Sequence, residues 1–139
     1  MWMLVDDKRS LPSDQIDIIA RNSAAAMAIL LGMGRDRLTG LVLDYDLGEK
    51  EPIFGERLSD GKKIRGTRTR EITGYDVLMF AIVNDLLPLT VQIITDNPAG
   101  RRRLHNGLIH DAKYVIKTIS SHGRTRITYV KPDEDEIVK

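Results

Sequence analysis

Short apolar runs alternate with longer segments of helical spacing over most of the chain. Four runs have the length and composition of buried strands: residues 2–5, 16–20, 38–43 and 89–94. Helical segments are expected between or after them, at residues 24–32, at 77–87 and from Pro98 onward. Strands that alternate with helices in this way predict an α/β fold with a doubly wound, mostly parallel sheet.

The expected helices carry recognisable boundary residues. Ser23 is a suitable N-cap for the first helix, and Gly32 and Gly34 are expected to end it. Asn97, followed by Pro98, is expected to cap the last helix. Leu104, Leu108 and Ala112 recur at four-residue spacing, so they should form the inner face of that helix.

The remaining segments complete the predicted organisation. Residues 114–121 and 124–130 are rich in β-branched side chains and predict a C-terminal β-hairpin. Residues 49–72, after the third strand, show no sustained periodicity and predict a functional or disordered insertion. We therefore expect one domain over residues 1–131 and an acidic tail over 132–139.

Composition narrows the functional classes. The chain has 139 residues, enough for one hydrophobic core, and its net charge of +1 argues against a general binder of nucleic acid or membrane surfaces. It contains no cysteine, which excludes disulfides, thiolate metal sites and cysteine nucleophiles. The apolar start is too short for a signal peptide or a membrane span, so a soluble, cytoplasmic protein is expected.

Polar residues follow three of the predicted strands. If the strand order is 2-1-3-4, the first and third strands are neighbours and their carboxyl ends meet in one crevice. Four carboxylates would then lie close together: Asp6, Asp7, Asp44 and Asp46. Like charges at that spacing repel one another, and a hard divalent cation relieves the repulsion. We therefore expect a metal site, with Mg²⁺ as its ion.

Features that suit an anionic ligand lie nearby. The segment from Asn97 to Gly100 should offer free backbone N–H groups at a helix start, and Arg101 follows it. Residues 61–70 hold five basic residues and no acidic one. That basic run either folds over a phosphorylated substrate as a lid or is a solvated loop, and the sequence leaves both readings open.

Four blocks of residues together resemble the cyclic-phosphate processing receiver-like domains, a divergent branch of the response-regulator receivers. In chain order the blocks are Asp6-Asp7-Lys8-Arg9, Leu43-Asp44-Tyr45-Asp46-Leu47-Gly48, Thr73-Gly74-Tyr75-Asp76 and Asn97-Pro98-Ala99-Gly100. Each stands at an expected strand or helix edge. The resemblance implies a receiver-like, flavodoxin-like fold and a role in processing cyclic phosphates on nucleotides or RNA ends.

Our leading hypothesis is a metal-dependent phosphoesterase whose substrate is a cyclic-phosphate nucleotide or RNA terminus. Asp6, Asp7 and Asp44 would hold the metal, and Asp44, Asp46 and Thr95 would serve catalysis. The phosphate would be bound by Arg9, Asn97, Gly100 and Arg101.

Two alternatives remain open at this point. If it is not this enzyme, the chain is either a signalling receiver whose Asp44 accepts a phosphoryl group or a non-catalytic module that binds a phosphorylated nucleotide ligand. Receivers carry a lysine, usually followed by proline, at the end of their fifth strand, and Lys117 lacks that context. The oligomeric state stays open.

Overall fold

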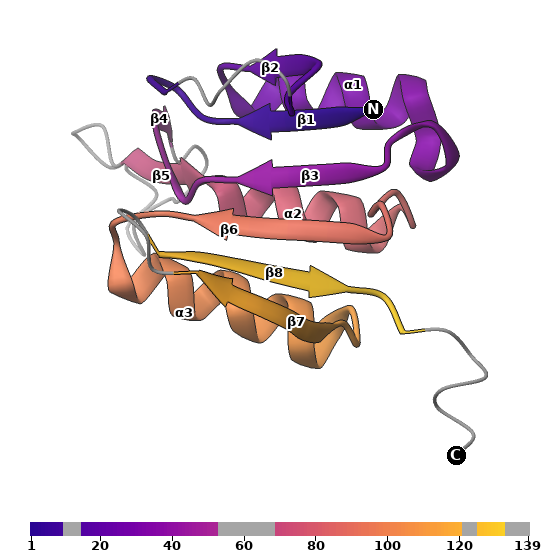
Figure 1. Ribbon diagram of the computed structural model, residues 1–139. Helices are drawn as coiled ribbons and strands as arrows, with labels where there is room; N and C mark the ends of the chain where they lie inside the picture. The colour runs from indigo at the N-terminus through magenta and orange to yellow at the C-terminus, as the bar shows by residue number, and fades with distance from the viewer. Residues whose placement is uncertain (10–14, 53–68, 121–124, 133–139) are drawn as a thin grey trace, which may run out of the picture.

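A six-stranded mixed sheet forms the centre of the computed structural model, which describes residues 1–9, 15–52, 69–120 and 125–132 (Figure 1). The strand order is β2-β1-β3-β6-β8-β7. The strands are β1 (Trp2–Val5), β2 (Ile18–Ala20), β3 (Gly40–Leu43), β6 (Thr90–Ile94), β7 (Val115–Ser120) and β8 (Arg126–Val130). The first four in this order pair in parallel, and β8 is antiparallel to both β6 and β7. The expected α/β fold with a C-terminal hairpin is confirmed.

The register of this sheet brings the polar strand ends together. Val5 of β1 pairs with Leu43 of β3, and Leu43 pairs with Ile93 of β6. Asp6 and Asp44 therefore leave the sheet side by side. Figure 1 shows that β1, β3 and β6 all end at this edge of the sheet. The expected 2-1-3-4 order is what produces this meeting point.

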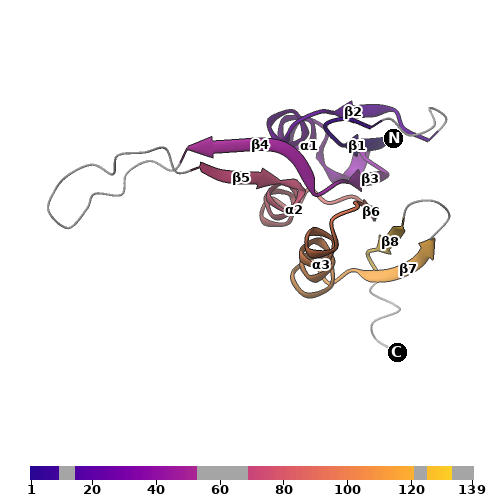
Figure 2. The same cartoon turned by 90° about the vertical axis from the view of Figure 1, so that its left-hand side faces the viewer.

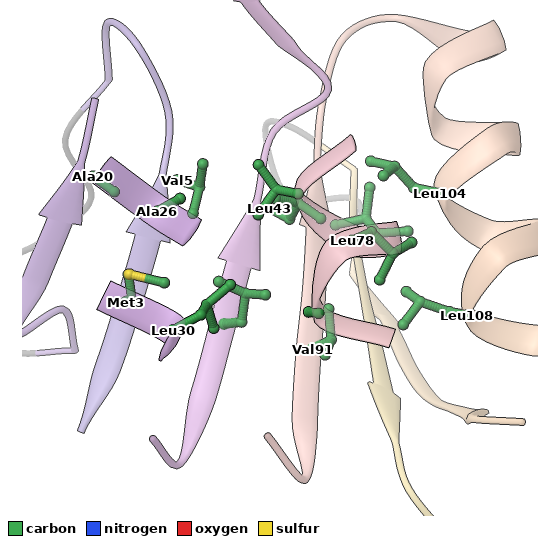
Figure 3. Packing of buried hydrophobic residues seen from close by; sticks show 14 of the residues in the cluster. Met3, Val5, Ala20, Ala26, Leu30, Leu43, Leu78, Val91, Leu104 and Leu108 are labelled. Atoms are coloured by element: carbon green, nitrogen blue, oxygen red, sulfur yellow. The ribbon is translucent and has the colours of Figure 1, made fainter. Parts of the chain in front are cut away.

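The described helices all lie on one face of the sheet (Figure 2). They are α1 (Ser23–Arg37), α2 (Gly74–Val83), α3 (Pro98–Asn106) and its short π-helical continuation η1 (Gly107–Asp111). Their buried side chains pack with those of β1, β3 and β6 in one core (Figure 3). Labelled members of that core include Met3, Leu30, Leu43, Leu78 and Leu104.

The other face of the sheet has a smaller apolar cluster without any described helix. Leu4, Val42 and Ile94 are buried there, and Trp2 and Ile16 pack against them. The Trp2 ring lies directly over Gly40, where a β-carbon would collide with it. This face differs because the described residues between β1 and β2 form no helix and the chain after η1 forms a hairpin.

Two helix boundaries differ from expectation. Asn22, not Ser23, caps α1, because its side-chain oxygen accepts the Ala25 N–H at 2.8 Å. The Ser23 hydroxyl instead donates to Glu49 at 2.9 Å. The helical region continues to Arg37 across a break at Gly34, whose φ of +64° only glycine adopts readily.

The second helix begins earlier and ends earlier than its hydrophobic pattern suggests. It spans Gly74–Val83, and the expected continuation to residue 87 is wrong. Thr73 and Asp76 form a reciprocal capping box that sets its start. The Leu86 N–H donates to the Ala81 carbonyl at 2.8 Å, so the chain turns there before Pro88.

The expected insertion after the third strand of the sheet is present, and its ends are regular. β4 (Asp46–Pro52) and β5 (Thr69–Thr73) form a separate two-stranded antiparallel sheet. The sequence conceals these strands because their residues are mostly polar and exposed. Residues 53–68, with most of the basic run, and the tail from 133 onward lie outside the described residues.

Gly74 stands where only a residue without a side chain fits. A β-carbon at Gly74 would overlap the carbonyl oxygen of Asp44. The Gly74 N–H also donates to the Tyr45 carbonyl at 2.8 Å. This close approach ties the start of α2 to the turn that follows β3, and so to the position of Asp44.

Gly74→Ala is predicted to destabilise the protein by at least about 1–3 kcal/mol, the usual cost of overpacking. Gly32→Ala is the matched control, because a β-carbon there meets nothing within 4 Å. Alanine at this helical position should stabilise by up to about 1 kcal/mol. Urea denaturation of both variants measures the two effects. A Gly74→Ala protein as stable as wild type would contradict the close approach.

Candidate metal centre

Three aspartates meet at the carboxyl edge of β1 and β3. Asp6, Asp7 and Asp44 each place one carboxylate oxygen so that the three atoms lie within 4.8 Å of one another. The first two directly follow β1, and Asp44 directly follows β3. Backbone hydrogen bonds hold Asp6 and Asp44 in position, since the Asp6 N–H donates to Ala20 O and the Asp44 N–H donates to Val5 O.

Asp6 is the most deeply buried of the three, with 1% of its surface exposed. Its Oδ1 accepts two backbone hydrogen bonds, from Lys8 N at 3.0 Å and from Arg9 N at 3.1 Å. Its Oδ2 is buried and accepts none from the described residues. An unpartnered carboxylate oxygen at this depth is costly unless a cation takes it.

Asp44 shares this environment and is 4% exposed. Burial raises the pKa of Asp44 above its ordinary value, and the negative charge of Asp6 raises that pKa further. Hydrogen bonds from the Thr95 side chain and the Tyr45 backbone, together with the charge of Arg9, act in the opposite direction on this pKa. The Tyr45 N–H donates to Asp44 Oδ1 at 2.8 Å, which leaves Oδ2 facing Arg9.

Glycine at position 48 leaves room for the carboxylate of Asp7. Gly48 has a φ of +66°, and a β-carbon on it would lie 3.0 Å from Asp7 Oδ2. Any other residue would therefore be strained and would press on that carboxylate. The glycine that ends the second block thus has a steric explanation.

A cleft of about 250 Å³ opens over the three aspartates. Its described lining also contains Asp46, Glu71 and Asp96, so six carboxylates surround it. Two positively charged side chains, Lys8 and Arg9, line the cleft as well. Sequence reasoning missed Lys8, Glu71 and Asp96. The signal for Asp96 was its position after β6, whereas nothing local marks Glu71 as part of this cleft.

The other predicted site residues lie at different distances from the cleft. Asp46 and Thr95 line the cleft, as does Arg9. Asn97 reaches its edge, where Asn97 Nδ2 lies 3.4 Å from Asp46 Oδ1. Gly100 and Arg101 lie beside the cleft and are not among its lining residues.

The free amides expected at the start of the last helix are mostly in use, which corrects that prediction. Gly100 N donates to Asn97 Oδ1 at 3.0 Å, and Arg101 N donates to Asn97 O at 2.8 Å. Gly100 serves a packing purpose, because the Tyr45 ring occupies the space of its missing β-carbon. The Arg101 guanidinium donates to the Thr95 carbonyl at 2.7 Å. A role for Asn97, Gly100 or Arg101 in phosphate binding stays a prediction.

Residues 1–110 match the protein family described as the cyclic-phosphate processing Receiver domain. The chain belongs to this family. No curated protein and no solved structure matches it. Among the described residues, no helix of this cyclic-phosphate processing receiver domain has the length and apolar character needed to cross a membrane.

The residues of this receiver domain fit a hard divalent cation. All three candidate ligands are carboxylates, the donors that Mg²⁺ prefers, and nothing in the described part of the chain donates a hydrogen bond to the buried Asp6 Oδ2. Asp6, Asp7 and Asp44 form the acidic cluster typical of a receiver metal site.

Divalent cations are predicted to stabilise the wild-type receiver domain. Ligand at a hundred times its dissociation constant adds about 2.7 kcal/mol to the free energy of unfolding. Thermal unfolding with increasing Mg²⁺ or Mn²⁺ measures this gain. Asp44→Asn should lose it, whereas Asp111→Asn, which removes an exposed carboxylate at the end of η1, should retain it. Equal gains in all three proteins would place the bound cation elsewhere.

Without metal, Asp44→Asn is predicted to be more stable than wild type at pH 7. Because the pKa of Asp44 is raised in the folded protein, this carboxyl favours folding while protonated, and that stability declines as pH rises from about 4 through the raised pKa. Asparagine removes the decline. Urea denaturation in chelator from pH 4 to 7 should show the advantage of the variant growing with pH. A difference in unfolding free energy between the two proteins that does not change with pH would contradict a raised pKa for Asp44.

Proposed function

We propose that this protein is a metal-dependent phosphoesterase that opens a cyclic phosphate on a nucleotide or an RNA end. The observation that carries the proposal is the buried Oδ2 of Asp6, which has no hydrogen-bond partner among the described residues and lies with oxygens of Asp7 and Asp44 in an open cleft. A buried carboxylate oxygen without a donor is the ligand geometry that a cation completes.

Asp6, Asp7 and Asp44 are the proposed ligands, and Mg²⁺ is the proposed ion. When bound, such an ion polarises a phosphoryl oxygen and lowers the pKa of a water molecule on it. The protein's contribution is to hold three carboxylates at fixed positions. The absence of a side chain at Gly48 leaves room for the Asp7 carboxylate, and its absence at Gly74 leaves room for the Asp44 carbonyl.

Asp46 is the proposed general base. It is exposed at the start of β4, and the Asn97 side-chain amide beside Oδ1 leaves Oδ2 to accept a proton. Water loses that proton to Asp46 as its oxygen bonds to phosphorus, and one ester P–O bond of the ring breaks. The departing ribose oxygen takes up a proton from solvent, and Asp46 releases its proton to solvent. The product is a phosphate monoester when the substrate is a cyclic phosphate diester.

Lys8 and Arg9 are the proposed partners of the substrate phosphate. Six carboxylates in one cleft repel an anion, so a phosphate needs local positive charge in addition to the metal. Arg9 presents a planar guanidinium at the mouth of the cleft, which matches two phosphate oxygens at once. Lys8 adds a second positive charge in the same lining.

Phosphoryl acceptance at Asp44 is the second candidate function. The hydrogen bond between the Thr95 side chain and Asp44 favours this candidate. The two residues directly follow the neighbouring strands β3 and β6, an arrangement that resembles the receivers. Lys117 speaks against it, because this residue lies in the exposed edge strand β7. A mass increase of about 80 Da after treatment with acetyl phosphate, absent in Asp44→Asn, would favour this candidate over hydrolysis.

A cleavage assay tests the proposed enzyme. With Mg²⁺ or Mn²⁺, the protein is offered 2′,3′-cyclic nucleotides, cyclic dinucleotides and RNA that ends in a cyclic phosphate. We expect metal-dependent product that falls at least about 100-fold in Asp44→Asn, because several kcal/mol of transition-state stabilisation depend on this ligand. Asp111→Asn is the matched control and should match wild type. If these substrates bind but yield no product, the protein is a binding module.

A further inference from the structure

One arginine faces three carboxylates at the mouth of the cleft. Nη2 of Arg9 lies 2.7 Å from Asp96 Oδ2. Nη1 of the same side chain lies 3.6 Å from Asp44 Oδ2 and 3.8 Å from Asp6 Oδ2. These last two oxygens belong to the aspartates that the proposed metal would bind.

The distances separate two kinds of contact. The contact with Asp96 is a charge-assisted hydrogen bond, whereas the other two are too long for hydrogen bonds. Arg9 therefore reduces the repulsion between Asp6 and Asp44 through its charge, while no residue that the structure describes donates a hydrogen bond to Asp6 Oδ2. A cation would not have to break a hydrogen bond to reach that oxygen.

The backbone of Arg9 is fixed while its side chain is half-exposed. Its N–H donates to Asp6 Oδ1 at 3.1 Å, so the residue is anchored to the carboxylate that its side chain faces. The Arg9 side chain is 37% exposed, and the side chain of its hydrogen-bond partner Asp96 is 66% exposed. An exposed ion pair of this kind is held weakly, so the side chain can change position without disturbing the core.

We propose that Arg9 is an exchangeable counter-ion that alternates between the aspartate pair and the substrate phosphate. Without metal, its charge compensates Asp6 and Asp44. A divalent cation on these aspartates repels the guanidinium, which remains near Asp96 and turns toward an anion in the cleft. The proposal rests on the proposed metal site and adds a coupling to it: metal and phosphate bind cooperatively because the metal releases Arg9.

This exchange makes Arg9 act in opposite directions on the two ligands. Removing its charge should strengthen cation binding, since one competing positive charge is gone. Removing it should weaken anion binding, since the phosphate loses a bidentate partner. A purely structural residue would weaken both, and an ion pair confined to Asp96 would change neither.

Arg9→Gln is the direct test, with isothermal titration of Mn²⁺ and then of inorganic phosphate at saturating Mn²⁺. We expect Mn²⁺ to bind roughly five- to tenfold more tightly, the scale for one screened charge a few Å away. We expect phosphate to bind about tenfold or more weakly, as for a lost charge-assisted contact. Arg102→Gln removes an exposed arginine from α3 and should change neither constant.

Arg9→Lys keeps the charge without the planar guanidinium. It should leave Mn²⁺ affinity within about twofold of wild type while weakening phosphate binding, because lysine cannot bind two oxygens in a fork. This variant also serves if Arg9→Gln folds poorly, which circular dichroism and thermal unfolding would reveal.

The outcomes separate this inference from the proposed function. If wild type binds Mn²⁺ and Asp44→Asn does not, the metal site stands. Unchanged or weakened Mn²⁺ binding in Arg9→Gln would then overturn the counter-ion exchange alone. If wild type binds no Mn²⁺, both the exchange and the proposed enzyme are overturned.

Discussion

The burial of two carboxylates at the ends of neighbouring parallel strands is the constraint on which the site depends. Asp6 and Asp44 are almost fully buried, their strands are adjacent in register, and each charge raises the cost of the other. The surrounding structure does not relieve this conflict completely: Arg9 compensates from 3.6 Å or more, and Asp6 Oδ2 keeps no hydrogen-bond partner among the described residues. A divalent cation bound at the base of this open cleft would relieve the remaining repulsion between the two carboxylates.

Much of this could be predicted from the sequence because strand ends are encoded locally. The apolar runs before Asp6 and Asp44 predict buried strands, and a mostly parallel sheet brings their ends to one edge. Once the 2-1-3-4 order is expected from the alternation of strands and helices, the cluster follows from the residues that end the first and third strands. The C-terminal hairpin was predictable for a similar reason, since its β-branched residues define both strands.

The rest depended on contacts that no local pattern encodes. The ion pair of Arg9 with Asp96 joins residues that are 87 positions apart. β4 and β5 form a sheet of their own in which Leu47 is the only buried apolar residue, so they lack the apolar runs by which strands are found. Asn22 and Ser23 are equally good caps by residue type, and the contact of Ser23 with Glu49 decides between them.

The most direct test of the metal site is a crystal structure with Mn²⁺, in which anomalous scattering locates the ion. We predict a peak about 2–2.5 Å from oxygens of Asp6, Asp7 and Asp44, the range for hard divalent cations. We also predict that the Arg9 guanidinium has moved away from Asp6 and Asp44. A saturated crystal without a peak among these three carboxylates would contradict the account.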